Sequence, residues 1–167
     1  MRKAIIVLIL FICSAIFCFA DSGANSFKPN FLQNGSVDSL KYIDFLNRRA
    51  MLMYETNVDS TFYYTTKARK ISERIDYAKG KADALNNLGI FFDIKGNLRM
   101  ALRYYNAGYI AYQELKDSAN AVQATMNIAM VYGQMDKNER SIQYYNKALN
   151  LGKKLSQDSI LSLVIYN

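Results

Sequence analysis

The sequence contains no histidine and no tryptophan, and its only proline is Pro29. Without histidine, the chain lacks the side chain that most often exchanges protons near neutral pH in enzymes. Both cysteines, Cys13 and Cys18, lie near the N-terminus, so the rest of the chain can form neither a disulfide nor a thiolate metal site. We therefore expect a non-enzymatic protein without a metal or other cofactor. The scarcity of proline favours an almost all-helical fold.

Residues 1–20 have the pattern of a secretory signal. Arg2 and Lys3 precede an apolar run over 4–20 that ends at the small residue Ala20. We predict cleavage after Ala20 and a location in the periplasm or on the exterior face of the inner membrane. The alternative is an uncleaved anchor, because the run reaches the lower limit of about 17 residues for spanning a bilayer. Apart from this signal, we expect that only a further C-terminal part of the chain could attach the protein to a membrane.

The formal net charge is +7, and loss of Arg2 and Lys3 with the signal would lower it to +5. The remaining basic residues are spread along the chain without a dense cluster, and Arg48 and Arg49 form a pair rather than a patch. Such a distribution is typical of a solvated surface, so we expect no nucleic-acid binding by this segment.

Residues 21–38 are rich in Ser, Asn and Gly and are expected to form a flexible lead-in. Apolar residues at spacings of three and four then predict helices over about residues 39–54, 59–75, 79–95, 97–116, 118–134 and 138–155, with a seventh over 160–167. Gly96 is predicted to take the left-handed conformation that ends a helix. The predicted N-terminal caps are Asp59 or Ser60, Asn97, Ser118 and Asn138.

The helical region repeats at a constant spacing, shown by the aligned tyrosines 64, 104 and 144 and by the small residues Ala68, Gly108 and Ala148. A period in this range with helical patterning predicts a solenoid, in which each unit buries its apolar face against its neighbours. Small residues are required where two helices cross closely. The solenoid is expected over 39–167, with units at about 42–75, 82–115 and 122–155 and the start of a fourth at 159–167.

These residues resemble the tetratricopeptide repeat, whose pattern includes Leu-Gly, an aromatic residue three positions on, an Ala on the second helix and an aromatic residue four later. The first unit is degenerate, since Arg49 occupies the position of the glycine. The period is 40 rather than 34, and the closing proline is missing from every unit. The residues that carry the pattern, and that we expect to pack the repeats together, are Leu88, Gly89, Phe92, Ala101, Tyr105 and Gly108 in the second unit and Ile128, Ala129, Tyr132, Ser141, Tyr145 and Ala148 in the third.

The resemblance implies an all-α fold, a right-handed α-solenoid of antiparallel helix pairs with about seven helices. It also implies a protein- or peptide-binding domain with a concave groove, as in exported or membrane-bound bacterial regulators of this family. The groove is lined by the first helix of each unit, where the family pattern places four asparagines spaced by 40: Asn47, Asn87, Asn127 and Asn167. Their neighbours in the groove would be Asp83, Asn86, Ile90, Met126 and Met130.

A side-chain amide offers both a donor and an acceptor, so each asparagine could hold the main chain of an extended peptide. It could equally bond to the neighbouring helix and hold the units together, because a buried amide needs partners in either case. The sequence leaves these two roles open.

Two functions follow. The chain could be the N-terminal sensor or scaffold part of a longer signalling protein that binds a peptide or protein segment. Alternatively, it could be a self-contained periplasmic adaptor. In that case the apolar final segment, residues 159–167, would be covered by self-association or by a partner, because a solenoid needs a polar end.

Overall fold

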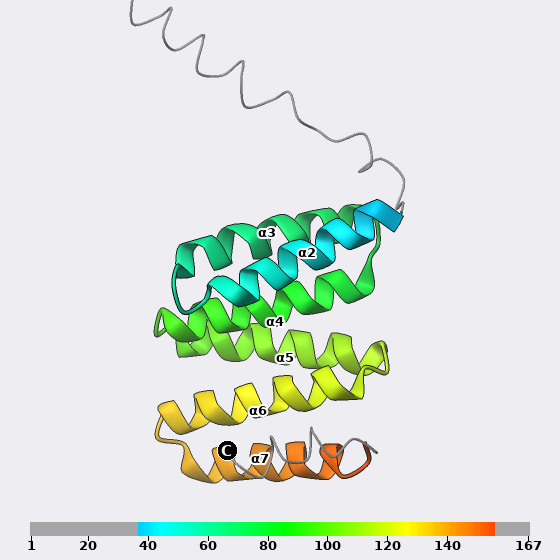
Figure 1. The fold of residues 1–167 in the computed structure, drawn as a ribbon. Helices are drawn as coiled ribbons and strands as arrows, with labels where there is room; N and C mark the ends of the chain where they lie inside the picture. The colour runs from blue at the N-terminus through cyan, green and yellow to red at the C-terminus, as the bar shows by residue number, and fades with distance from the viewer. Residues whose placement is uncertain (1–36, 156–167) are drawn as a thin grey trace, which may run out of the picture.

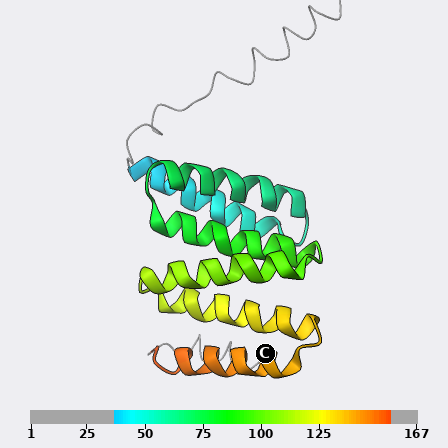
Figure 2. The ribbon, with the colours of Figure 1, turned by 180° about the vertical axis from the view of Figure 1, so that it is seen from behind.

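The computed structural model describes residues 37–155, and this part of the chain is entirely helical. Its helices stack in chain order, with α2 and α3 at one end and α7 at the other (Figures 1 and 2). The prediction of an all-α solenoid of antiparallel helix pairs is confirmed. The predicted signal, residues 21–36 and the seventh helix lie outside the described residues. The helices are α2 (Val37–Met53), α3 (Val58–Arg74), α4 (Ala78–Ile94), α5 (Leu98–Glu114), α6 (Ser118–Gln134) and α7 (Asn138–Gly152).

From α3 onward, the helices begin at a constant interval along the chain, at positions 58, 78, 98, 118 and 138. The interval is constant because α3, α4, α5 and α6 each have 17 residues and are joined by turns of equal length. In each turn the N–H of the third residue donates to the carbonyl five residues earlier, as from Asn97 to Phe92 at 2.8 Å. This is the Schellman motif, which requires a left-handed residue in the middle of the turn. Gly96 takes this conformation, as predicted, and the other left-handed residues are Asp76, Lys116 and Asp136.

The helix caps differ from the prediction at three places. Asn57, rather than Asp59 or Ser60, caps α3 by accepting a hydrogen bond from the Ser60 N–H at 3.0 Å. Asp117 caps α6 in place of Ser118, which is already the first helical residue. Asn138, the predicted cap of α7, is already the first helical residue. Lys137 precedes it and makes no side-chain cap bond. Asn97 caps α5 as predicted.

Glycine permits the closest approach between two helices. A Cβ atom added at Gly89 would lie 2.3 Å from Cδ1 of Tyr105, well inside van der Waals contact. The Tyr105 ring therefore packs directly against the backbone of α4 and is only 2% exposed. Ala101 and Ala148 are fully buried at other contacts between helices. These small residues allow the helices to stack closely.

Two hydroxyls bind the second helix of a unit to the first. Thr61 Oγ1 donates to the Ala50 carbonyl at 3.1 Å, and Ser141 Oγ donates to the Ala129 carbonyl at 2.9 Å. The residue at this position in the middle unit is Ala101, which has no hydroxyl. Thr65, one turn after Thr61, is also fully buried, but its Oγ1 has no partner among the described residues.

Candidate functional site

A cleft of about 320 Å³ crosses the first helix of each unit, α2, α4 and α6. Tyr112 of α5 closes one side of it. The cleft is lined by Asp44, Asn47, Arg48, Met51, Lys79, Asp83, Asn86, Asn87, Tyr112, Asn120 and Gln123.

The charges in the cleft are balanced, with two carboxylates and two cations. Asp83 accepts a hydrogen bond from the Tyr112 hydroxyl at 3.0 Å and forms an ion pair with Lys79 at 2.7 Å. Asp44 accepts a hydrogen bond from the Tyr77 hydroxyl at 3.0 Å. The amides between these charges can recognise dipolar groups, and the mixed signs give no preference for an anion.

The tyrosine hydroxyls that hold the two carboxylates stay protonated at neutral pH. Burial and the hydrogen bond to Asp44 raise the pKa of Tyr77 to about 12. Burial, together with the charge of Asp83, raises the pKa of Tyr112 further. At neutral pH both hydroxyls therefore keep their protons and donate hydrogen bonds that orient the two carboxylates.

Asn47 and Asn87 connect one unit to the next. Asn47 Nδ2 donates to the Gly80 carbonyl at 2.9 Å, and Asn87 Nδ2 donates to the Asn47 carbonyl at 3.0 Å. Both side chains are 5% exposed. Of the two roles that the sequence left open, the structure therefore shows the inter-helix role for these two asparagines. Asn47 Oδ1, at the floor of the cleft, has no hydrogen-bond partner among the described residues.

Asn127 belongs to a chain of partly buried amides that extends to α4. Its Nδ2 donates to Asn86 Oδ1 at 3.3 Å, and its Oδ1 accepts from Gln123 Nε2 at 3.1 Å. These bonds hold Asn86 and Gln123 at the surface of the cleft. The fourth asparagine of the predicted ladder, Asn167, lies outside the described residues.

Residues 80–154 match the family model described as Tetratricopeptide repeat. This segment is an array of tetratricopeptide repeats. It begins within α4 and reaches just past α7. Tetratricopeptide repeats generally bind protein or peptide partners, so this is a protein-interaction repeat domain.

No curated protein matches this chain. Among solved structures, it is similar to the crystal structure of BtubC (BKLC) from P. vanneervenii, with 16% sequence identity and a TM-score of 0.47. The match covers 77% of this chain and 63% of that chain. The match thus spans less than two thirds of the length of that protein.

The other predicted groove residues differ in their burial and in whether they line the cleft. Asp83 and Asn86 line the cleft. Ile90 is partly buried against the cluster around Tyr105, whereas Met130 is 42% exposed on α6. The prediction was wrong for Met126, which is buried at 2% exposure. It lies one turn after Val122 on the side of α6 that packs on Ala148 of α7.

The residues predicted to pack the repeats lie in the interior. Phe92, Tyr132 and Tyr145 are partly buried, and the other nine of the set are buried. In the second unit the ring of Tyr105 packs on Gly89 and is buried. In the third unit Ala129 occupies the position of Gly89, and the corresponding ring, that of Tyr145, is only partly buried. The methyl group of Ala129 explains part of this difference in burial.

Several cleft residues were missed by the sequence analysis. Asp44 lies three residues before Asn47, Lys79 four before Asp83, and Asn120 seven before Asn127. These spacings put each of them on the same helix face as its neighbour, so the helical period could have found them. Tyr112 carries no such signal, because it reaches the cleft from α5.

Within residues 37–155, no three acidic, histidine or cysteine side chains come close enough together to hold a metal ion. No helix in this region combines the length and the apolar character needed to cross a bilayer.

Proposed function

We propose that the cleft on α2, α4 and α6 binds an extended peptide segment of a partner protein and catalyses no reaction. The observation that carries this proposal is the continuity of the cleft, to which α2, α4 and α6 contribute the side-chain amides of Asn47, Asn86 and Gln123, among others. An amide can pair with the N–H or the C=O of a peptide unit whatever its side chain. The balanced charges of Arg48, Lys79 and the two aspartates suit a neutral main chain better than a terminal carboxylate.

The test is selection of peptides on the immobilised full chain, followed by affinity measurements on the best one. The variant Asn86→Ala with Gln123→Ala removes two partly exposed amides of the cleft. If each makes one hydrogen bond to the peptide, the affinity should fall roughly tenfold. Asn146→Ala with Asn150→Ala is the matched control, because these amides are exposed on α7, away from the cleft. Equal affinity of the two double variants, with unchanged helix content, would refute the proposal.

We further propose that the protein is exported and serves as the sensor or scaffold part of a signalling protein. The support for export is the sequence alone, in which Arg2 and Lys3 precede the apolar residues 4–20. The support for the sensor or scaffold role is the resemblance to exported and membrane-bound regulators of this family. Cell fractionation with mass measurement tests it: a species in the periplasm or on the membrane is expected, and retention in the cytoplasm would contradict export. A small, self-associating soluble species would instead favour the adaptor alternative based on residues 159–167.

A further inference from the structure

The outer face of α2 combines exposed apolar and basic side chains. Val37, Phe45 and Leu52 are 66%, 55% and 65% exposed. Exposed basic residues, Lys41, Arg48 and Arg49, alternate with them. At about 3.6 residues per turn, all six fall within an arc of about 120°. The opposite side of the helix carries the buried residues Ile43, Leu46 and Ala50.

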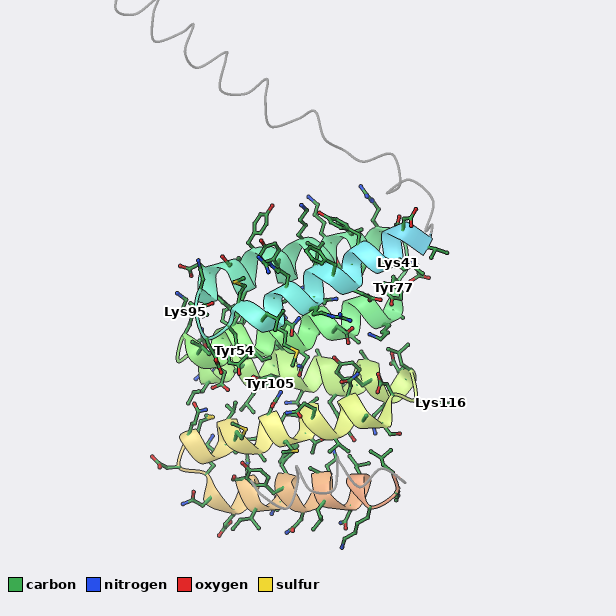
Figure 3. All side chains as sticks on the ribbon, in the orientation of Figure 1. Lys41, Tyr54, Tyr77, Lys95, Tyr105 and Lys116 are labelled. Atoms are coloured by element: carbon green, nitrogen blue, oxygen red, sulfur yellow. The ribbon has the colours of Figure 1, made fainter. Side chains whose placement is uncertain are left out.

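This face lies at the end of the helix stack, where Lys41 is labelled in Figure 3. A further repeat unit packed on this face would cover the exposed cations Lys41, Arg48 and Arg49. Their desolvation without acidic partners would carry a high cost in free energy. The face is therefore not built to receive a further unit of the solenoid.

A second copy of α2 is also a poor partner for this face. In an antiparallel pair centred on Phe45, Lys41 of one helix would lie opposite Arg48 and Arg49 of the other. Asp38 is the only acidic residue in the same arc, so like charges would dominate the contact. The occupant should carry negative charge together with apolar groups.

We propose that the outer face of α2 rests on the surface of a bilayer containing anionic lipids. Large apolar side chains interleaved with lysine and arginine are the composition of helices that lie in the membrane interface, where the apolar groups enter the acyl region and the cations face lipid phosphates. The position in the chain favours a lipid surface over an acidic protein. The proposal rests on the uncleaved alternative given above, in which the apolar run 4–20 remains as an anchor. In that form only residues 21–36 separate the run from Val37, and a chain of that length extends at most about 55 Å.

The absence of tryptophan from the chain allows a direct test. Phe45→Trp places a single fluorescent reporter on the proposed contact, and Ile142→Trp places one at a similarly exposed position on α7, where Ile142 is 60% exposed. Each full-length variant is bound to vesicles of phosphatidylcholine and phosphatidylglycerol whose acyl chains carry bromine. The apolar run 4–20 could by itself hold both variants on vesicles, so the amount bound is not the readout.

Bromine should quench the reporter at position 45 several-fold more than the reporter at position 142. The difference should disappear on vesicles of phosphatidylcholine alone. It should also disappear when Lys41→Gln and Arg49→Gln are added to Phe45→Trp; Arg48, which also lines the cleft, is left unchanged. Equal quenching of the two reporters would overturn the proposal. Protection of position 45 from acrylamide without quenching by bromine would overturn it as well, since a protein would then cover the face. Leu52→Trp repeats the measurement at a second site.

Discussion

Two buried threonines on α3 show how strongly the value of a hydroxyl depends on its partner. Thr61 Oγ1 donates to the Ala50 carbonyl, whereas Thr65 Oγ1 is buried with no partner in the described residues. Thr65→Val removes an unsatisfied polar group at nearly constant volume, so it should stabilise the domain by about 1 kcal/mol. Thr61→Val breaks a hydrogen bond and leaves a carbonyl unpaired, so it should destabilise by about 1 kcal/mol.

Urea denaturation followed by circular dichroism measures both threonine variants under the same conditions. The valine substitution itself is common to the two, so the opposite signs isolate the effect of the hydrogen bond. A destabilised Thr65→Val variant would mean that the Thr65 hydroxyl does have a partner.

The buried glycines on α4 and α5 predict opposite responses to one added methyl group. At Gly89 the new Cβ would meet the buried Tyr105 ring at 2.3 Å, so Gly89→Ala should destabilise by about 1–3 kcal/mol. At Gly108 the nearest atom, the Asn86 nitrogen, would be 3.4 Å away, an ordinary contact. Because alanine favours helices over glycine, Gly108→Ala should be neutral or stabilise by up to about 1 kcal/mol. Thermal unfolding of both variants checks the pair, and a larger loss at Gly108 would contradict it.

At the scale of the element, the turn residues give a stabilising substitution. Lys116 is an exposed residue with φ of +57°. It occupies the same position in the turn between α5 and α6 as Gly96 in the turn between α4 and α5. It lies on the opposite edge of the stack from Lys95 (Figure 3). A left-handed conformation costs a residue with a Cβ about 1–2 kcal/mol, partly offset in glycine by its more flexible unfolded chain. Lys116→Gly should therefore raise the free energy of unfolding by about 0.5–1 kcal/mol.

Lys116→Ala is the control for this turn, because it removes the same charge and side chain but keeps the Cβ. It should leave the free energy of unfolding within the error of a denaturation curve. Equal gains from both substitutions would show that the lysine charge, rather than the backbone conformation, limits the stability of the turn.

The ends of the six described helices were predicted from the sequence to within three residues, and both ends of α6 were predicted correctly. The apolar period and the cap at Asn97 are local signals, and so is Gly96. The left-handed conformations of Asp76, Lys116 and Asp136 could not be predicted. They follow from the need to reverse the chain in a short turn between packed helices, which tertiary contacts impose on residues without such a preference.

For the cleft too, the sequence predicted which residues are present but not how tertiary contacts orient them. The family resemblance implied that Asn47, Asp83, Asn86 and Asn87 share one surface, and all four line the cleft. It could not decide where the Asn47 and Asn87 amides point, because this depends on the distance between neighbouring helices. That distance is set by small residues such as Gly80, whose carbonyl accepts the Asn47 bond.

At the scale of the whole molecule, buried tyrosines make the stability sensitive to alkaline pH. Burial raises the pKa of Tyr77 to about 12 and raises those of Tyr105 and Tyr112 as well. Above about pH 10 the unfolded chain loses these phenolic protons while the folded chain keeps them. Unfolding then releases protons, so the free energy of unfolding should fall as the pH rises from about 10 to about 12.

Urea denaturation at a series of pH values measures this slope. Tyr112→Phe should make it shallower, because one proton fewer is released on unfolding, although the loss of the bond to Asp83 also lowers the stability at neutral pH. Tyr63→Phe is the control, since Tyr63 is 58% exposed and its removal should leave the slope unchanged. A slope that does not depend on Tyr112 would show that its hydroxyl ionises equally in both states.

The repetition of one turn has a consequence for the gene. Residues 77–116 form a block that follows the left-handed residue Asp76 and ends on the left-handed residue Lys116. Excision of this block, or its duplication in frame, would join residues in the same turn conformation and require no new loop. Excision would place α6 beside α2 and α3 in the position of α4, where the ring centroids of Phe62 and Phe91 now lie 4.7 Å apart. Duplication would create one new contact, between α5 and a second copy of α4. Unequal recombination can therefore change the length of the array, and with it the length of the cleft, without altering the connections between helices.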